Sequence, residues 1–360
     1  MAHIAMVVSN PCAPDPRVLR EASWLTKEGH EVQIHAFDRQ QLHPETELVD
    51  GVSIIRYHLG IFPYGGLLST HNGLAKFRKA VSSYLNQHPP EVIFCHDADT
   101  LHVGCRLRSK HTIPLIFDMH DLHHTWILMP NPRSLIRSLI SRLMKWRMLN
   151  RATRADVVVT SSDGFRDWMA NYGIECTVVE NRPCKREPLK QPEQFTIGYF
   201  GRIREIESFN LLAAAIDKME TPPCVKIAGD GVAAENVRAI LPEAEFHGAF
   251  DSEQLQSLMA GISVMFAMYP PERGNISDGA IPAKMFDAAS FGRPSVVNAG
   301  CPMGELCEVE GLGIAVPWGN EVALAQALTN LNGESVELQH DEVREKERLL
   351  RAVNGLKQLS

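Results

Sequence analysis

Residues 281–294 read IPAKMFDAASFGRP, and this stretch joins a polar loop to the start of a helix. Pro282 stands near the first helical position, where proline is tolerated, and residues 292–294 end the helix before the apolar strand Ser295–Val297. The unpaired N–H groups and the positive dipole end of such a helix start favour a phosphate or a diphosphate. The stretch therefore predicts an anion site; the alternative is an ordinary surface helix between two strands.

Apolar runs typical of buried parallel strands recur along the chain between longer helical patterns. They lie at 3–8, 32–37, 52–57, 92–95, 115–118, 157–160 and 177–179, and again at 195–200, 225–228, 245–247, 262–267, 295–298 and 313–316. This alternation predicts two doubly wound α/β domains, 1–182 and 195–333, joined by a linker at 183–194 that is rich in proline and charge. A charged helical segment at 334–360 should pack back toward the first domain. Ligands of such domains bind at the carboxyl ends of strands, so we expect a site in the cleft between the domains.

The composition is that of a cytoplasmic globular protein. Of the 360 residues 44% are hydrophobic and 22% are charged, and the net charge of -7 argues against a nucleic-acid-binding protein. Eight cysteines occur without a Cys-x-x-Cys pair, which indicates neither a zinc site nor a disulfide framework. The first apolar run ends too early for a signal peptide, and no later run is long enough to span a bilayer.

Further motifs occur in a fixed order along both halves. They are DPRVLREA at 15–22, GHEV at 29–32, HDAD at 96–99, DMHD at 118–121, GYFGR at 198–202, IAGDG at 227–231, FHG at 246–248 and P-x-K-x-F-D at 282–287. Across most of the chain this order resembles glycosyltransferase family 4. The resemblance implies the GT-B fold, with two Rossmann-like domains facing across a cleft. It also implies transfer of a sugar from a UDP-, GDP- or ADP-linked donor, with retention at the anomeric carbon and without a cofactor or metal.

The resemblance assigns roles to particular positions. Arg202 matches the arginine that stabilises the departing diphosphate, His120 matches the histidine that touches the transferred sugar, and Asp287 would hold the ribose hydroxyls. The other candidate donor residues are Gly201, Arg204, Gly229, Gly231, Asp278, Gly279, Ala280, Ile281 and Lys284, and those on the acceptor side are Ser9, Asn10, Asp15 and Arg17.

Two positions depart from the family pattern. The family has a lysine a few residues after the arginine, where this chain has Glu207, and a carboxylate there would repel a diphosphate. Either Arg204 or Lys284 supplies the second cation, Glu207 turns away, or activity is low. Gly279 replaces the first acid of the family's acid pair. These departures leave two alternatives open: a non-catalytic GT-B module that binds nucleotide or a partner protein, and a sugar-nucleotide epimerase.

A separate signal lies between residues 131 and 155, which contain seven basic residues and no acid. Apolar residues such as Leu135, Leu139 and Trp146 are interspersed among them. On an otherwise acidic protein this pattern predicts a peripheral contact with the anionic inner face of a membrane. The acceptor would then be a glycan or a lipid-linked saccharide in envelope polysaccharide synthesis. The alternative is a helix whose apolar side packs on the sheet and whose arginines are solvated.

Overall fold

The computed structural model describes residues 1–62, 67–128 and 133–356 and divides the chain into two compact units. Unit 1 comprises Met1–Glu180 together with Glu345–Ser360, and unit 2 comprises Asn181–Arg344. The last segment of the chain, which the sequence prediction treats as one piece, is therefore divided between the units. Within the described residues, no helix has both the length and the apolar character that a membrane span requires.

Unit 1 contains an eight-stranded sheet with the strand order β3-β4-β2-β1-β5-β6-β7-β8. The strands are β1 (His3–Val8), β2 (Glu31–Ala36), β3 (Thr46–Val49), β4 (Val52–Arg56), β5 (Val92–His96), β6 (Leu115–Met119), β7 (Val157–Thr160) and β8 (Thr177–Val178). All neighbours are parallel except β3, which pairs antiparallel with β4 at the edge. The predicted strands of this half are present to within one residue at each end. Strand β3 was not predicted, because its exposed residues show no apolar run.

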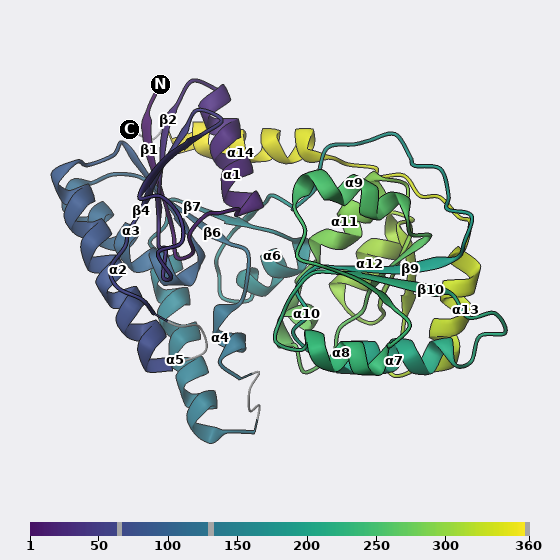
Figure 1. Cartoon of the computed structure of the whole chain (residues 1–360). Helices are drawn as coiled ribbons and strands as arrows, with labels where there is room; N and C mark the ends of the chain where they lie inside the picture. Colours follow the sequence, from purple (N-terminus) through teal and green to yellow (C-terminus); the bar gives the residue numbers. More distant parts are fainter. Residues whose placement is uncertain (63–66, 129–132, 357–360) are drawn as a thin grey trace. The chain divides into compact units, whose positions relative to one another are not determined.

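Unit 1 contains seven helices in the described residues. They are α1 (Pro16–Lys27), α2 (Leu67–Gln87), α3 (Asp97–His111), α4 (His123–Trp126), α5 (Leu135–Ala152), α6 (Asp163–Ala170) and α14 (Glu342–Leu356), which begins in unit 2. Figure 1 shows α1 and α14 on one face of the sheet and α2 and α3 on the other. Leu349, Val353 and Leu356 of α14 are buried in the same hydrophobic cluster as Val18 and Leu25 of α1.

Unit 2 contains a six-stranded parallel sheet in the order β11-β10-β9-β12-β13-β14 (Figure 1). The strands are β9 (Thr196–Phe200), β10 (Cys224–Ala228), β11 (Glu245–Gly248), β12 (Val264–Ala267), β13 (Ser295–Asn298) and β14 (Gly313–Val316). The helices are α7 (Glu207–Ile216), α8 (Ala234–Ile240), α9 (Ser252–Ala260), α10 (Gly274–Asp278), α11 (Ala283–Ser290), α12 (Pro302–Val309) and α13 (Glu321–Leu331). The strand order reverses between β9 and β12, and a crevice at the carboxyl ends of such a pair is the usual ligand site of an open α/β sheet.

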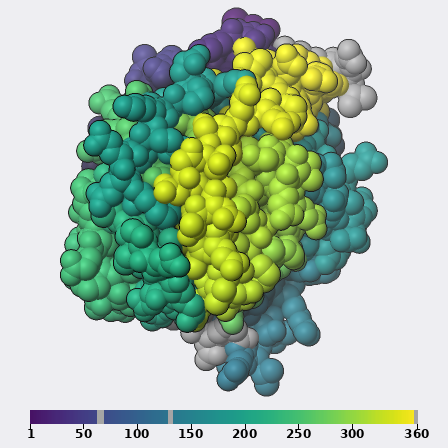
Figure 2. Space-filling view, turned by 90° about the vertical axis from the view of Figure 1, so that its right-hand side faces the viewer, coloured from purple at the N-terminus to yellow at the C-terminus, as the bar shows by residue number. Residues whose placement is uncertain are grey.

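Residues 183–194 form neither helix nor strand and lie against the segment that follows α13. Lys185 pairs with Glu337, and the Gln191 side chain donates to the backbone oxygen of Glu334. Figure 2 shows the yellow C-terminal segment running beside the teal one over the surface of unit 2. The two chain segments that connect the units are therefore bonded to each other along the surface of unit 2.

Candidate functional site

Two strand-end loops of unit 2 are fastened to each other through glycines. The N–H of Gly201, after β9, donates to the backbone oxygen of Ala228 at 2.8 Å. A Cβ on Gly229 would lie 1.9 Å from the backbone oxygen of Gly201, and one on Gly231 would lie 2.0 Å from that of Ile203. Both glycines also have positive φ, at +138° and +154°. Only glycine fits these positions, which set the shape of the loops at the candidate donor site.

Lys284 belongs to the first turn of α11 and reaches back to the end of β9. Its Nζ lies 3.3 Å from the ring centroid of Tyr199 and 5.7 Å from that of Tyr269. It also lies 3.5 Å from the position that a Cβ on Gly201 would occupy. Within the described residues it forms no salt bridge, and burial together with the charge of Arg273 lowers the pKa of Lys284 well below its usual value. The amine of Lys284 is thus partly buried, has no salt-bridge partner in the described residues, and gains stabilisation of its charged form when an anion binds beside it.

Arg273 is a second cation at this place that sequence reasoning missed. Its guanidinium lies 4.6 Å from the ring centroid of Tyr269, and its Nη1 lies 3.4 Å from Oε1 of Glu205. The backbone N–H and C=O of Tyr269 are both bonded to the side chain of Asn298 at 2.8 Å, so the ring is firmly placed. Two tyrosine rings therefore hold Lys284 and Arg273 together beside the carboxyl ends of β9 and β12. No strand or helix periodicity in the sequence marks Arg273.

Arg202 follows β9 and Glu207 starts the next helix; both side chains are exposed, but their partners differ. The Arg202 side chain is 66% exposed, and its Nη1 lies 3.2 Å from Oδ1 of Asp230. Glu207 is the first residue of α7, and its Oε2 accepts a hydrogen bond from the N–H of Ile206 at 3.1 Å. A carboxylate at a helix N-terminus is favourable, so Glu207 has a structural role at its own helix. Arg204, between them, is half-buried and adds positive charge near Tyr199.

The other candidate donor residues lie between α10 and α11. Gly279 ends α10 with φ +130°, a conformation that favours glycine. Ala280 and Ile281 are partly buried against the neighbouring hydrophobic cluster, and Asp278 and Asp287 are half-buried on their helices. The sequence analysis placed Pro282 near the first helical position. In the structure Pro282 is the N-cap, and helix α11 begins one residue later, at Ala283. No side chain caps this N-terminus, so its backbone N–H groups are suited to bind an anion.

In unit 1, a network of acids and histidines occupies the carboxyl ends of β5 and β6. Both carboxylate oxygens of Asp118 accept hydrogen bonds from Arg17, at 2.6 and 2.8 Å. His120 bridges Asp118 and Asp97, with Nδ1 and Nε2 each 3.0 Å from a carboxylate oxygen. Burial disfavours a charged ring, but Asp97 and Asp118 together raise the pKa of His120 well above its usual value. Both the raised pKa and the two carboxylate contacts favour the protonated ring, which can donate from both ring nitrogens.

Asp97 is the centre of a part of this network to which sequence reasoning assigned no role. Its φ is +62°, an uncommon value for a residue other than glycine, and its Oδ2 also lies 3.2 Å from Nε2 of His123. Nδ1 of His123 is 3.6 Å from Asp99, which accepts a hydrogen bond from the hydroxyl of Ser9 at 3.3 Å. The HDAD motif at the end of a predicted strand was the available signal for Asp97 and Asp99. His123 had none.

The candidate acceptor-side residue Arg17 lies in the buried part of this network. This residue is only 5% exposed and pairs with Glu21 as well as Asp118, because helix α1 carries it beneath the strand ends. It orients Asp118 from the core and does not face a surface at which an acceptor could bind. Asp15 caps α1 and accepts a hydrogen bond from the side chain of Asn10 at 2.7 Å, so these two residues shape the turn after β1.

Three potential metal ligands of unit 1, His96, Asp118 and His120, offer atoms within 4.8 Å of one another. The guanidinium of Arg17 already binds both oxygens of Asp118. A divalent cation would be repelled by this adjacent positive charge, and it would have to displace a bidentate ion pair. The donor set does not fit a metal ion.

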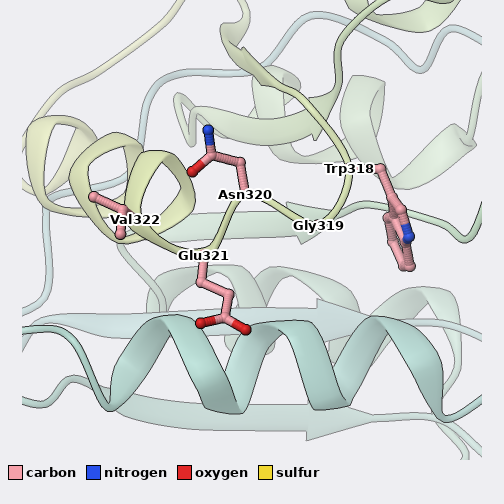
Figure 3. A pocket seen from close by; sticks show the side chains of 5 residues that line it. All are labelled: Trp318, Gly319, Asn320, Glu321 and Val322. Atoms are coloured by element: carbon pink, nitrogen blue, oxygen red, sulfur yellow. The ribbon is translucent and has the colours of Figure 1, made fainter.

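A surface hollow in unit 2 lies at the start of α13 and is lined by Trp318, Gly319, Asn320, Glu321 and Val322 (Figure 3). The side chains of Asn320 and Glu321 point to opposite sides of the chain in this view. Asn320 caps α13, and Glu321 pairs with Lys218 at 3.4 Å. The polar groups of the hollow therefore serve the local fold and do not converge on a ligand.

Comparison with known proteins assigns both units to described families. A model described as glycosyl transferase 4-like domain matches residues 13–182, and one described as glycosyl transferases group 1 matches residues 194–333. No curated protein matches the sequence.

Three solved structures illustrate the fold. Sucrose-phosphate synthase from Thermosynechococcus elongatus is 16% identical with a TM-score of 0.75, over 99% of this chain and 97% of that one. Anabaena HepE in complex with UDP-glucose is 15% identical with a TM-score of 0.68, over 99% and 100%. The lipopolysaccharide outer core galactosyltransferase WaaB is 15% identical with a TM-score of 0.60, over 97% and 95%. At these identities the likeness shows the fold alone, which is the GT-B fold predicted from the sequence.

Proposed function

The chain belongs to the group 1 glycosyltransferases and uses a nucleotide-sugar donor, and on this premise we propose that it transfers the sugar with retention and without a metal ion. The observation that carries the proposal is the ammonium group of Lys284. It lies among aromatic rings beside a switch point of the sheet, partly buried and without a salt-bridge partner in the described residues. A cation placed in this way is stabilised by a bound anion, and a diphosphate is the anion that the donor supplies.

The transfer chemistry explains why several cations are needed. As the bond between the anomeric carbon and the diphosphate breaks, the sugar becomes oxocarbenium-like and negative charge accumulates on the leaving group. Lys284, Arg273 and Arg202 supply positive charge around the strand-end loops of unit 2, and the N-terminus of α11 adds backbone N–H groups. Side chains can therefore neutralise the leaving diphosphate, which supports the proposal that no metal takes part. The family has a lysine at the position of Glu207. In this assignment Lys284 takes over the phosphate contact of that lysine.

Retention requires that the acceptor hydroxyl attack from the face that the diphosphate leaves. The bond from the anomeric carbon to the acceptor oxygen then forms as the bond to the phosphate oxygen breaks, and the hydroxyl proton passes to that phosphate oxygen. His120 has no free lone pair for the proton, since both of its nitrogens face carboxylates and its pKa is raised. We therefore assign His120 to a contact with the transferred sugar rather than to proton abstraction.

Nucleotide binding is the first test of the donor site. HepE is similar in fold and binds UDP-glucose, so we expect UDP to bind more tightly than GDP or ADP in calorimetric titrations. Lys284→Ala should weaken UDP binding by about tenfold or more, because one charge-assisted contact is lost. Lys218→Ala is the control, because Lys218 follows the end of α7 and pairs with Glu321 at the start of α13.

The outcomes separate the proposed enzyme from its alternatives. If none of the three nucleotides binds, the donor site assigned here is wrong. Binding of UDP without turnover or donor hydrolysis would identify a non-catalytic module, and an altered sugar in the absence of acceptor would identify an epimerase. An inverted product anomer would contradict the proposed retention.

We further propose that the acceptor is presented at an anionic membrane surface in envelope polysaccharide synthesis. Helix α5 carries an exposed apolar stripe whose members are Leu135, Ile136, Leu139 and Trp146, at 61% to 86% exposure. The alternative in which these side chains pack on the sheet does not agree with this exposure. Exposed arginines flank the stripe, and the described part of the run contains no acid, which favours an anionic lipid surface. Residues 131 and 132 of the run lie outside the described residues. The WaaB likeness agrees with such a role.

Sedimentation with lipid vesicles tests the membrane proposal. We expect binding to anionic vesicles that falls with added salt, and little binding to neutral ones, since each exposed basic residue near anionic lipid contributes about 1 kcal/mol. Leu139→Asn with Trp146→Ala should reduce binding, and Val232→Asn, at a 93% exposed valine of unit 2, should not. Equal binding to both lipid types, or none to either, would favour a soluble acceptor.

A further inference from the structure

A second hollow of about 360 Å³ lies in unit 1, among helices α2, α3 and α5. Asn86 of α2 lines it together with His102, Arg106 and Lys110 of α3, and with Arg151 and Arg154 at the end of α5. Helix α3 begins at Asp97, in the histidine and acid network, and runs away from the strand ends. The lining residues belong to its later turns, so this hollow is separate from the candidate active site of unit 1.

The lining of this hollow is strongly basic on a protein whose net charge is -7. Arg106, Lys110, Arg151 and Arg154 are cations, and no acid lines the hollow. In the part of the chain that the structure describes, none of the four forms a salt bridge. The carboxylate of Asp156, two residues beyond Arg154, is held by both Nε and Nη2 of Arg108. Its charge is therefore not available to this hollow.

The cations are held close enough to disfavour one another. Burial and the charges of Arg78, Arg147 and Arg154 lower the pKa of Arg151. Burial and the charge of Arg151 likewise lower the pKa of His102. Arg106, Lys110 and Arg154 are exposed at the rim, whereas Arg151 is half-buried and less free to move away from its neighbours. The hollow therefore gathers positive charge with no acid in its lining to balance it.

Asn86 fixes one of the cations in place. Its Oδ1 accepts a hydrogen bond from Nζ of Lys110 at 2.8 Å, and its Nδ2 donates to the backbone oxygen of Ser82 at 2.7 Å. An ammonium group anchored on one side by a neutral amide keeps its charge and two N–H donors for a ligand. The arginines opposite it present planar forks, which suit phosphate oxygens.

We propose that this hollow binds a phosphate group with at least two negative charges, distinct from the donor diphosphate. A free phosphate ester and the head of a phospholipid both present this group, and the recognising chemistry is the same for the two sources. The proposal goes beyond the transferase activity and does not depend on it. Bound phosphate would draw the four cations together and remove their mutual repulsion, so binding should be strongest at low ionic strength.

Pyrophosphate is the probe for a free phosphate, and vesicles with phosphatidic acid are the probe for a lipid head. Calorimetric titration of pyrophosphate is made on the full chain saturated with UDP, and is repeated on the Lys284→Ala variant. In both titrations pyrophosphate binding at the donor site is suppressed, by bound UDP or by the substitution. The binding that remains therefore reports on the hollow, and a wrong assignment of the donor site can be distinguished from a wrong assignment of the hollow. The test variant is Arg151→Gln with Arg154→Gln. The matched control is Arg238→Gln with Arg351→Gln, which removes two exposed arginines outside both the hollow and the basic run of α5.

We expect the test variant to weaken pyrophosphate binding by at least about tenfold, or 1.4 kcal/mol, and the control to leave it nearly unchanged. If only vesicles bind, a loss that is greater in the test variant than in the control identifies a lipid head as the ligand. Equal losses in the two variants would mean non-specific attraction and would overturn the proposal. So would the absence of binding to both probes. Unfolding temperatures of the variants show whether each is folded.

Discussion

At the residue scale, Arg202 and Lys284 differ in exposure, and their substitution should separate turnover from donor binding. Arg202→Ala should lower kcat by about two orders of magnitude with a small change in UDP affinity, because an exposed guanidinium can approach the phosphate as charge develops on it. Lys284→Ala should lower both quantities. Initial rates over a range of donor concentrations measure the two effects, with Arg238→Ala, which removes an exposed arginine of α8, as the control. Unchanged kcat in Arg202→Ala would show that its role is wrongly assigned.

The surroundings of Lys284 also predict a pH dependence of donor binding. Burial and Arg273 lower the pKa of Lys284 in the free protein, and a bound diphosphate should raise it again. Affinity should therefore be full below the free-state pKa and should fall as pH rises through it, because binding then requires uptake of a proton. Calorimetry in buffers of different ionisation enthalpy measures this uptake. Lys284→Met should bind UDP without it, and the same uptake in that variant would mean that another group titrates.

Some of these site residues could be predicted from the sequence and others could not, for a physical reason. Lys284 lies in a sequence motif that predicts the start of a helix after a strand-end loop. Its place near the strand ends could therefore be predicted from the local sequence. Arg273 is recognisable only through Tyr269 and Glu205, which reach it by folding of separate loops. The sequence marked Arg17 only as part of a motif, and its burial depends on Asp118, which lies far away in the sequence.

At the element scale, the strands were predictable because buried parallel strands are continuous apolar runs. The sequence did not predict which face of an amphipathic helix is buried. The apolar residues of α5 have ordinary helical spacing, yet the helix turns Leu135 and Leu139 outward and buries Ser141, Met148 and Ala152. Which face packs depends on α3 and α4, and the sequence of α5 alone does not contain that information.

The contact between the loops after β9 and β10 makes a prediction about stability. Gly229→Ala should destabilise unit 2 by well over the 1 kcal/mol or so that a left-handed backbone costs, since its Cβ would lie 1.9 Å from a backbone oxygen. Gly300→Ala is the control, because Gly300 has φ +70° but open space around its Cβ position. Urea denaturation compares the two variants. Similar losses would mean that the loops can separate at little cost.

At the scale of the whole molecule, the chain crosses between its units twice, and the last crossing returns it to unit 1 through α14. The sequence analysis predicted a helical segment at 334–360 that packs back toward the first domain, although the charged helical pattern by itself does not specify which core a helix joins. Leu349, Val353 and Leu356 complete the unit 1 core, and the carboxylate of Glu345 accepts a hydrogen bond from the N–H of Glu180 at 2.7 Å. The end of the chain is thus part of the N-terminal unit.

This arrangement predicts that damage to the last helix unfolds the first part of the chain. Leu349→Ala should destabilise unit 1 by about 2–5 kcal/mol, the usual range for truncating a fully buried leucine, and should leave unit 2 nearly unaffected. Hydrogen exchange followed by mass spectrometry measures each unit separately: peptides of β1, β5 and β6 should lose protection, and those of β9 and β12 should keep it. Val343→Ala, at a 58% exposed position of the same helix, is the control. Loss of protection in unit 2 alone would mean that burial of Leu349 stabilises unit 2, and that α14 belongs to the core of unit 2 instead of unit 1.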